Sequence, residues 1–161
     1  MNINNTEIER KFLVDRLPGG LDKCKCLNIR QGYISTDPTI RLRQCDDKYI
    51  LTVKGAAHNN GLDRAEFELP LTKEQFVKLW EKTETGAIVK KRYIVPLEDG
   101  LTAELDIYAD KLDGFMNVEV EFSSLKQAIL FDAPDWFGAE VTEDRRYSNA
   151  SLVKYGIPVK K

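Results

Sequence analysis

Polar and apolar residues alternate along much of this chain with the two-residue period of a β-strand. The clearest case is the segment EIERKF near the start, in which Glu7, Glu9 and Lys11 fall on one face of a strand. Ile8 and Phe12 fall on the opposite face. The pattern therefore predicts a strand with one ionic face and one largely apolar face.

The same alternation over the whole chain predicts eight strands. They cover about 3–15, 26–35 and 62–70, the hairpin pair TIRLRQ and KYILTVKG, the pair AIVKKRYIVPL and LTAELDIYAD, and about 115–123. Short connections between successive strands favour antiparallel neighbours. The predicted fold class is α+β, mainly β.

Three segments have the signals of helices. Thr72 is a suitable N-cap with Gln75 three residues later, which predicts a helix near 73–84. Phe76, Leu79 and Trp80 would give that helix an apolar stripe. The segment LKQAILF and residues Asn149–Tyr155 predict two further short helices.

The polar faces of the predicted strands are almost entirely charged, and the charges are sorted by strand. Acidic pairs stand at positions 7/9, 66/68, 104/106 and 119/121, and basic pairs at 41/43 and 90/92. One interpretation is a sheet with one solvated face, as antiparallel sheets often have. The other is a closed eight-stranded antiparallel barrel whose ionic faces line a water-filled tunnel. We favour the barrel, with the predicted helices packed outside on its apolar wall, because paired like charges suit a highly charged ligand and its metal ions.

Composition sets broad limits on this picture. The chain has 161 residues, 42% hydrophobic and 31% charged, which suits a single domain over residues 1–161. A formal net charge of −2 provides no basic field for nucleic acid. No apolar run approaches the roughly 20 residues of a membrane span, and the N-terminus does not resemble a signal peptide. We expect a cytoplasmic protein that binds neither nucleic acid nor membrane.

Thiol and imidazole chemistry is poorly supported. Cys24, Cys26 and Cys45 are odd in number, and their spacing matches neither a disulfide framework nor a zinc site. The single histidine, His58, lies in a segment with the composition of a loop. A histidine-dependent triad is therefore not expected.

The ionic pattern suggests one class of ligand. Arginine and lysine bind phosphate oxygens, and carboxylates bind Mg²⁺ or Mn²⁺, which bridge protein and phosphate. Linked phosphates would carry enough negative charge to match the six or so cations of the tunnel. The chemistry would be phosphoryl transfer to water, driven by positioning and charge stabilisation without a protein nucleophile.

Several motifs resemble those of the CYTH, or triphosphate tunnel metalloenzyme, superfamily. EIERKF resembles its ExExK signature, and RLR, the lysine of TVKG, RAEFE, KKR, ELD and VEVEF follow in family order. Near the end, EVTEDRRYSNASL resembles the family's EVT…YSN segment. The resemblance covers nearly the whole chain and implies an eight-stranded antiparallel tunnel with divalent-metal-dependent action on triphosphates.

The resemblance also implies roles for individual residues. The metal-binding set is Glu7, Glu9, Glu119, Glu121 and Asp106, and the substrate-binding set is Lys11, Arg41, Arg43, Lys54, Lys90, Arg92 and Arg145. Of these, we expect Glu7, Glu9, Lys11, Arg43 and Glu121 to be catalytic. Gln31 also matches a family position, and Glu66, Glu68, Glu104 and Asp106 match acidic tunnel positions. The alternative for each residue is a structural salt bridge within the wall.

The expected function is hydrolysis of inorganic tripolyphosphate, with nucleoside triphosphates as further substrates. A class IV type adenylate cyclase or a thiamine triphosphatase on the same scaffold is the enzyme alternative. Either would need a ring-binding pocket, for which Tyr33, Tyr108, Trp136 and Tyr147 are candidates. The non-enzyme alternative is a polyphosphate-binding module. A homodimer is compatible with the sequence, which leaves the oligomeric state, the preferred metal and the water-orienting carboxylate open.

Overall fold

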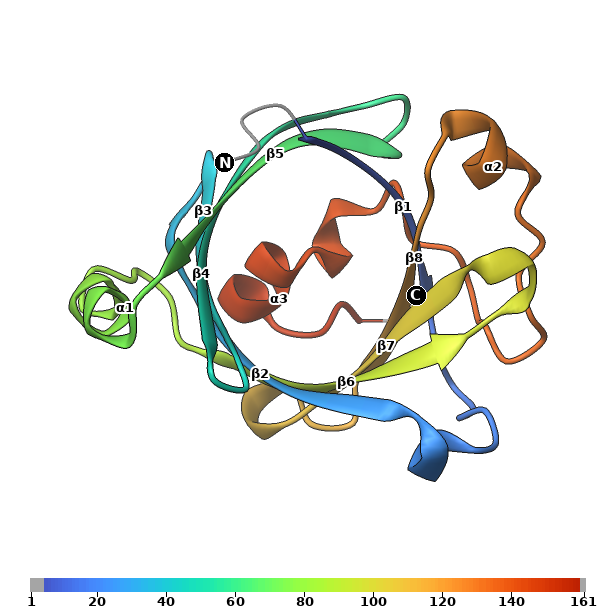
Figure 1. Cartoon of the computed structure of the whole chain (residues 1–161), viewed down its shortest axis with the longest axis horizontal. Helices are drawn as coiled ribbons and strands as arrows, with labels where there is room; N and C mark the ends of the chain where they lie inside the picture. Colours follow the sequence, from blue (N-terminus) through green and yellow to red (C-terminus); the bar gives the residue numbers. More distant parts are fainter. Residues whose placement is uncertain (1–4, 160–161) are drawn as a thin grey trace.

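A computed structural model describes residues 5–159, and its strands form one closed barrel (Figure 1). The strands are β1 (Asn5–Leu13), β2 (Lys25–Thr36), β3 (Thr39–Cys45), β4 (Lys48–His58), β5 (Asp63–Leu71), β6 (Ile88–Pro96), β7 (Thr102–Tyr108) and β8 (Met116–Glu121). Around the barrel they follow the order β1-β5-β4-β3-β2-β6-β7-β8, and every neighbouring pair is antiparallel. The predicted eight-stranded antiparallel barrel is therefore confirmed.

The helices are shorter than the strands and lie at the periphery and at one opening of the barrel. They are α1 (Lys73–Trp80), α2 (Leu125–Leu130) and α3 (Asn149–Tyr155), with 3₁₀ turns η1 (Leu21–Lys23), η2 (Glu98–Gly100), η3 (Asp110–Leu112) and η4 (Arg145–Tyr147). The first strand was predicted over about 3–15 but ends at Leu13, and residues 3 and 4 lie outside the described residues. The helix predicted over 73–84 ends at Trp80, after which Lys82 N donates to Leu79 O in a tighter turn.

The barrel has an ionic inside and an apolar outside. Lys90 and Asp106 point inward and are 1% and 0% exposed. On the opposite faces of the strands, an apolar core forms between the outer wall and the chain that covers it, from Phe12, Leu105, Val118, Val120, Phe122, Ala128 and Phe137. Burial of this outer face supplies the hydrophobic stabilisation that an ionic interior cannot.

Helix α1 begins with the predicted capping box. Thr72 accepts a hydrogen bond from Gln75 N at 3.1 Å, and the Gln75 side chain accepts one from Thr72 N at 2.9 Å. Phe76 is buried against Tyr49 with ring centroids 5.0 Å apart, so the helix packs on the outer wall.

Replacing Thr72 by alanine removes one half of this capping box. We expect the Thr72→Ala variant to lose about 1 kcal/mol of unfolding free energy, measured by urea denaturation. Thr72→Ser keeps the hydroxyl and should lose much less. Equal losses in both variants would contradict the capping explanation.

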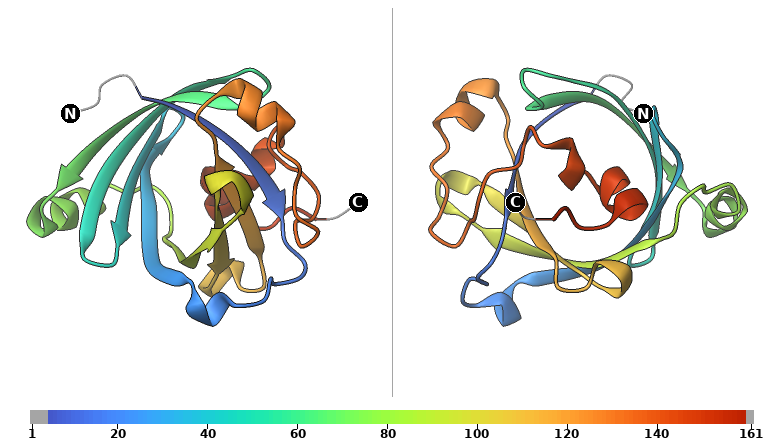
Figure 2. Two further views of the ribbon diagram at one scale, coloured as in Figure 1. Left: turned by 45° about the vertical axis from the view of Figure 1, so that its right-hand side comes forward. Right: turned by 180° about the vertical axis from the view of Figure 1, so that it is seen from behind.

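Helix α3 differs in position from the other two helices. It was expected to cover the outer wall, as α2 does, but it lies across one opening of the barrel (Figures 1 and 2). Leu152 is 1% exposed and packs with Tyr33, Ile88 and Tyr108 at that opening. Asn149 Oδ1 accepts a hydrogen bond from Tyr108 OH at 2.7 Å. The C-terminal segment thereby reaches from the outside of the wall to its inside.

Candidate active site

Two groups of interior charges, one of four glutamates and one of four cations, come from different parts of the barrel wall. Glu7, Glu9, Glu119 and Glu121 come from β1 and β8, which are neighbours, and form what we call the acidic side. Arg41, Arg43, Lys90 and Arg92 come from β3 and β6, which flank β2, and form the basic side. Lys11 and Lys54 lie near the acidic side. The sequence prediction that these strands bring their charges into one interior is supported by this arrangement.

On the acidic side the carboxylates outnumber the lysines. In the strand register Glu9 is opposite Glu121, and Lys11 is opposite Glu119. Burial raises the pKa of Glu9 well above its ordinary value, and the neighbouring charges of Glu119 and Glu7 add to the effect. The raised pKa favours the neutral form of Glu9, whose side chain is hydrogen-bonded to that of Glu119.

Glu119 has the opposite behaviour. Burial alone would raise its pKa, but Lys11 and Arg92 and the hydrogen bond from Glu9 hold it well below its usual range. The pKa of Glu121 is raised by burial and by the charge of Glu7. The raised pKa values of Glu9 and Glu121 indicate that added positive charge would stabilise this side of the cavity.

Two lysines connect the acidic side to the rest of the interior. Lys54 Nζ lies 3.0 Å from Glu7 Oε2 and 3.5 Å from Glu66 Oε2. Lys11 Nζ lies 3.3 Å from Glu119 Oε1 and donates to the carbonyl of Tyr147 at 3.3 Å. Within residues 5–159, no three carboxylate, thiol or imidazole groups converge closely enough to hold a metal ion. Lys54 and Lys11 thus form ion pairs with Glu7 and Glu119, two carboxylates that the family resemblance assigns to metal binding.

Asp106 organises the basic side. Its Oδ2 accepts from Lys90 Nζ at 2.7 Å, and its two oxygens accept from Arg92 at 2.7 and 2.9 Å. Arg92 also donates to Glu104 Oε2 at 2.6 Å. The sequence placed Asp106 in the metal-binding set, but both of its oxygens are here engaged by cations.

Lys90 is the most strongly buried cation. Its pKa is lowered to about 7, mainly by burial and also by the positive charges of Arg92 and Arg43, with Asp106 opposing the shift. Asp106 Oδ2 lies 2.7 Å from Lys90 Nζ and favours the charged form of the lysine. An anion bound beside Lys90 would favour the charged form further.

Arg41 and Arg43 are cations with no acidic partner. Among the described residues, neither forms an ion pair with a carboxylate. Arg43 Nε donates to Gln31 Oε1 at 2.9 Å, and Arg41 Nη2 donates to Thr52 Oγ1 at 3.3 Å. Arg41 Nε is buried without a hydrogen-bond partner. Burial and the charges of Arg41 and Arg92 lower the pKa of Arg43 to about 10. Such crowded cations are a site for an anion.

A cavity of about 350 Å³ opens next to the acidic side. It is lined by Glu7, Glu9, Lys11 and Lys54 from the strands and by Arg145 from η4. Arg145 and Arg146 are both exposed, but Arg145 lines this cavity, whereas Arg146 is paired with Asp144 at 2.7 Å.

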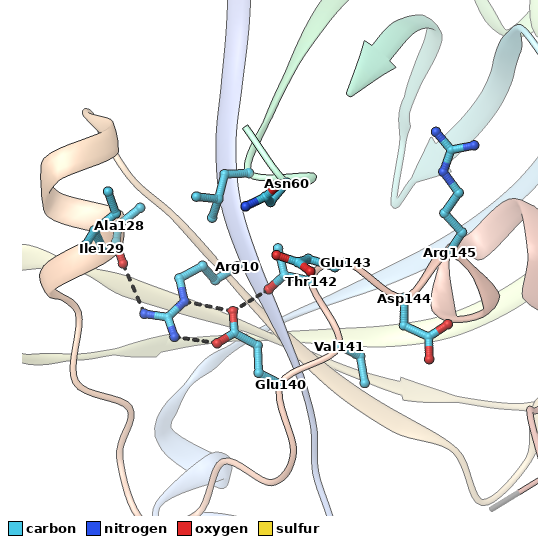
Figure 3. Close-up of a pocket in the computed structure, with 11 residues that line it drawn as sticks. Arg10, Asn60, Ala128, Ile129, Glu140, Val141, Thr142, Glu143, Asp144 and Arg145 are labelled. Atoms are coloured by element: carbon cyan, nitrogen blue, oxygen red, sulfur yellow. Dashed lines mark hydrogen bonds and ion pairs between the residues drawn. The ribbon is translucent and has the colours of Figure 1, made fainter. Parts of the chain in front are cut away.

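A larger cavity of about 840 Å³ lies outside the barrel wall, beside Arg10 and α2 (Figure 3). Its basic residues are Arg10, which is bound to Glu140, and Arg145. We assign the candidate site to the smaller cavity and the interior behind it, because Glu7 and Glu9 of the acidic side line this cavity together with the cations Lys11, Lys54 and Arg145.

Known proteins agree with this geometry. The CYTH domain family model matches residues 5–150. Two inorganic triphosphatases are similar: one from Nitrosomonas europaea, 46% identical over 91% of this chain and 96% of its own length, and one from Acetivibrio thermocellus, 37% identical over 92% and 93%. The chain belongs to the CYTH family.

Solved structures of CYTH-like folds give the same result. A crystal structure of an inorganic triphosphatase has a TM-score of 0.67 at 43% identity and covers 91% of this chain and 97% of that chain. A Hippeastrum adenylyl cyclase candidate, described as having dominant triphosphatase activity, has a TM-score of 0.59 over 76% of this chain and 82% of that chain. At 15% identity, the second likeness concerns the fold alone.

The structure also shows where the other residues named in the sequence analysis lie. The ring-binding candidates Tyr33, Tyr108 and Tyr147 are buried in the cluster around α3, and Trp136 packs on the outer core. Glu68 is exposed. The sequence analysis gave no functional role to Asn117 or Asn149, although Asn149 belongs to the quoted YSN motif. No helix among the described residues is long and apolar enough to cross a membrane.

Proposed function

We propose that this CYTH protein hydrolyses the terminal phosphate of inorganic tripolyphosphate and accepts nucleoside triphosphates as further substrates. The observation that carries the proposal is the pair of arginines on β3, the buried Arg41 and the partly buried Arg43, neither of which forms an ion pair with a carboxylate of the described residues. An enclosed anion of high charge would neutralise them. The similarity to two inorganic triphosphatases supports a chain of three phosphates as that anion.

The acidic side has the donor chemistry for a hard divalent cation, although its carboxylates do not converge in the side-chain positions of this structure. Its four carboxylates outnumber the nearby Lys11 and Lys54, and the charges of Glu119 and Glu7 help to raise the pKa of Glu9, so added positive charge would be favourable there. We propose that Glu7, Glu9, Glu119 and Glu121 hold Mg²⁺ or Mn²⁺, which when bound would supply Lewis-acid polarisation of the phosphate. Asp106 would serve instead to hold Lys90 and Arg92 in place.

The protein's own residues would position the substrate. Lys11, Lys54 and Arg145 would bind phosphate oxygens at the cavity, and Arg41, Arg43, Lys90 and Arg92 would bind those deeper in the barrel. Because the positive charges are fixed before the substrate arrives, they stabilise the charge that develops as the terminal phosphate is cleaved. We propose Glu7, Glu9, Lys11, Arg43 and Glu121 as the catalytic set.

Release of phosphate from tripolyphosphate tests the proposal. Purified protein should release phosphate when Mg²⁺ or Mn²⁺ is present, and a chelator should abolish the release. Re-addition of the metal in excess of the chelator should restore it. Tight binding of tripolyphosphate without any release would favour a binding module, and formation of cyclic AMP from ATP would favour a cyclase.

A further inference from the structure

Arg10 is the charged residue of the EIERKF motif that points out of the barrel, and all three nitrogens of its guanidinium donate hydrogen bonds (Figure 3). Its Nε donates to Glu140 Oε2 at 2.9 Å, and Nη2 donates to Oε1 of the same carboxylate. Its Nη1 donates to the carbonyls of Ala128 and Phe131 at 3.0 Å each. One guanidinium thus joins β1, the end of α2 and Glu140.

Thr142 links Glu140 to the backbone of Lys11. Thr142 Oγ1 donates to Glu140 Oε2 at 2.6 Å and accepts from Lys11 N at 3.0 Å. Val141 N donates to Lys11 O at 2.8 Å. Thr142 and Val141 of the EVT motif thus hydrogen-bond to the backbone amide and carbonyl of Lys11 from outside the barrel wall.

Residues 138–148, which we call the C-terminal strap, then carry the connection to the cavity. Gly138 N donates to Leu13 O at 2.7 Å, which fixes the start of the strap on β1. At its other end, Arg145 lines the cavity and Tyr147 O accepts from Lys11 Nζ at 3.3 Å. Figure 3 shows Arg145 extending from the strap well away from Arg10.

These contacts exceed what a surface ion pair needs. Exposed ion pairs contribute little to stability, whereas a two-pronged arginine–carboxylate contact with further fixed partners restricts geometry. The geometry here restricts the path of the strap at the point where it leaves the outer wall. The path of the strap in turn restricts the positions of Lys11 and Arg145, which both line the cavity.

We infer that Arg10, Glu140 and Thr142 are positioning residues that hold Lys11 and Arg145 in place to bind the phosphate chain. This inference rests on the proposed function, because it takes the phosphate chain as the ligand of that cavity. None of the three touches the reacting atoms. They act through the strap.

A double-mutant cycle between Glu140→Gln and Arg145→Ala tests the inference. We expect Arg145→Ala alone to raise KM for tripolyphosphate about tenfold. In the Glu140→Gln background it should raise KM less than about threefold, because Arg145 is already misplaced. Glu140→Gln alone should raise KM several-fold and change kcat less than about twofold. If the two substitutions raise KM by independent factors that multiply in the double variant, the inference is wrong.

Matched variants separate positioning from a general loss of structure. Asp135→Asn removes an acid from an exposed ion pair with Arg16 on the same outer surface, and it should leave KM unchanged. Thr142→Val breaks the link between Glu140 and Lys11 N, and it should repeat the coupling to Arg145 even if Glu140→Gln does not fold. Thr142→Ser should restore the wild-type KM. A Thr142→Ser variant as impaired as Thr142→Val would contradict the role of the hydroxyl.

Binding distinguishes a failure here from a failure of the proposed function. If the wild-type protein releases no phosphate, the proposed function is wrong, and the same cycle is measured as the Kd for tripolyphosphate by calorimetry. Non-additive changes in the free energy of binding would support positioning of Arg145 through the strap, and additive changes would contradict it.

Discussion

Replacing Glu9 by glutamine is expected to reduce metal-dependent hydrolysis of tripolyphosphate on the order of a hundredfold or more without destabilising the fold. Burial and the charges of Glu119 and Glu7 raise the pKa of Glu9 well above its ordinary value, which favours its neutral form, and its side chain is hydrogen-bonded to Glu119. The neutral amide of glutamine can donate the same bond, so the folded state loses little. It cannot offer the charged oxygens that a divalent cation needs.

Two measurements on the Glu9→Gln variant separate these effects. Phosphate release at saturating Mg²⁺ should fall steeply, whereas the midpoint of thermal unfolding without metal should be unchanged or higher. Added Mg²⁺ should raise that midpoint for the wild-type protein and not for the variant. Full activity in Glu9→Gln would remove the acidic side from the mechanism. The exposed Glu98→Gln serves as the control, because it changes the same charge outside the barrel.

Replacing Asp106 by alanine is expected to cost about 3–5 kcal/mol of unfolding free energy. The side chain is fully buried and accepts hydrogen bonds from both Lys90 and Arg92. Its removal leaves these two cations together in the interior without their shared counter-charge. Urea unfolding measures the loss. Glu104→Gln is the matched control, because Glu104 contacts Arg92 alone and its side chain is 29% exposed, so a much smaller loss is expected.

The contribution of Asp106 should also depend on pH. Burial alone would raise its pKa, but Arg92 and Lys90 lower the pKa below the ordinary 3.8. A carboxyl whose pKa is lowered by folding stabilises the native state above its unfolded pKa, and the contribution is lost as the pH falls through the folded value. The stability difference between wild type and Asp106→Ala should therefore shrink as the pH falls below about 4.

The fold was largely predictable because the two-residue alternation is strong and the charges are sorted by strand. The positions of Glu7, Arg43 and Glu121 inside one barrel follow from that pattern and from closure. The position of α3 does not, because an apolar stripe at helical spacing fits the outer wall and the barrel opening equally well. Residues Asn149–Tyr155 were predicted as a helix with the observed bounds, but not as a cover for the interior.

Ion-pair partners were the least predictable part of the site. Lys54 reaches Glu7 and Lys11 reaches Glu119 because of the stagger between strands far apart in sequence, which no local pattern specifies. Arg10 was assigned only to the outward face of its strand. Its connection to Glu140 spans 130 positions of the sequence and required the strap to be placed.

Closure of the barrel also affects how copies of this chain can meet. β1 is hydrogen-bonded to both β5 and β8, so the ring leaves no open sheet edge along the described strands. A neighbouring chain therefore has no row of free backbone groups on which to add a strand, a common route to aggregation. Association between native copies would have to use side chains, and the exposed Ile129 and Leu130 of α2 offer adjacent apolar surface for it.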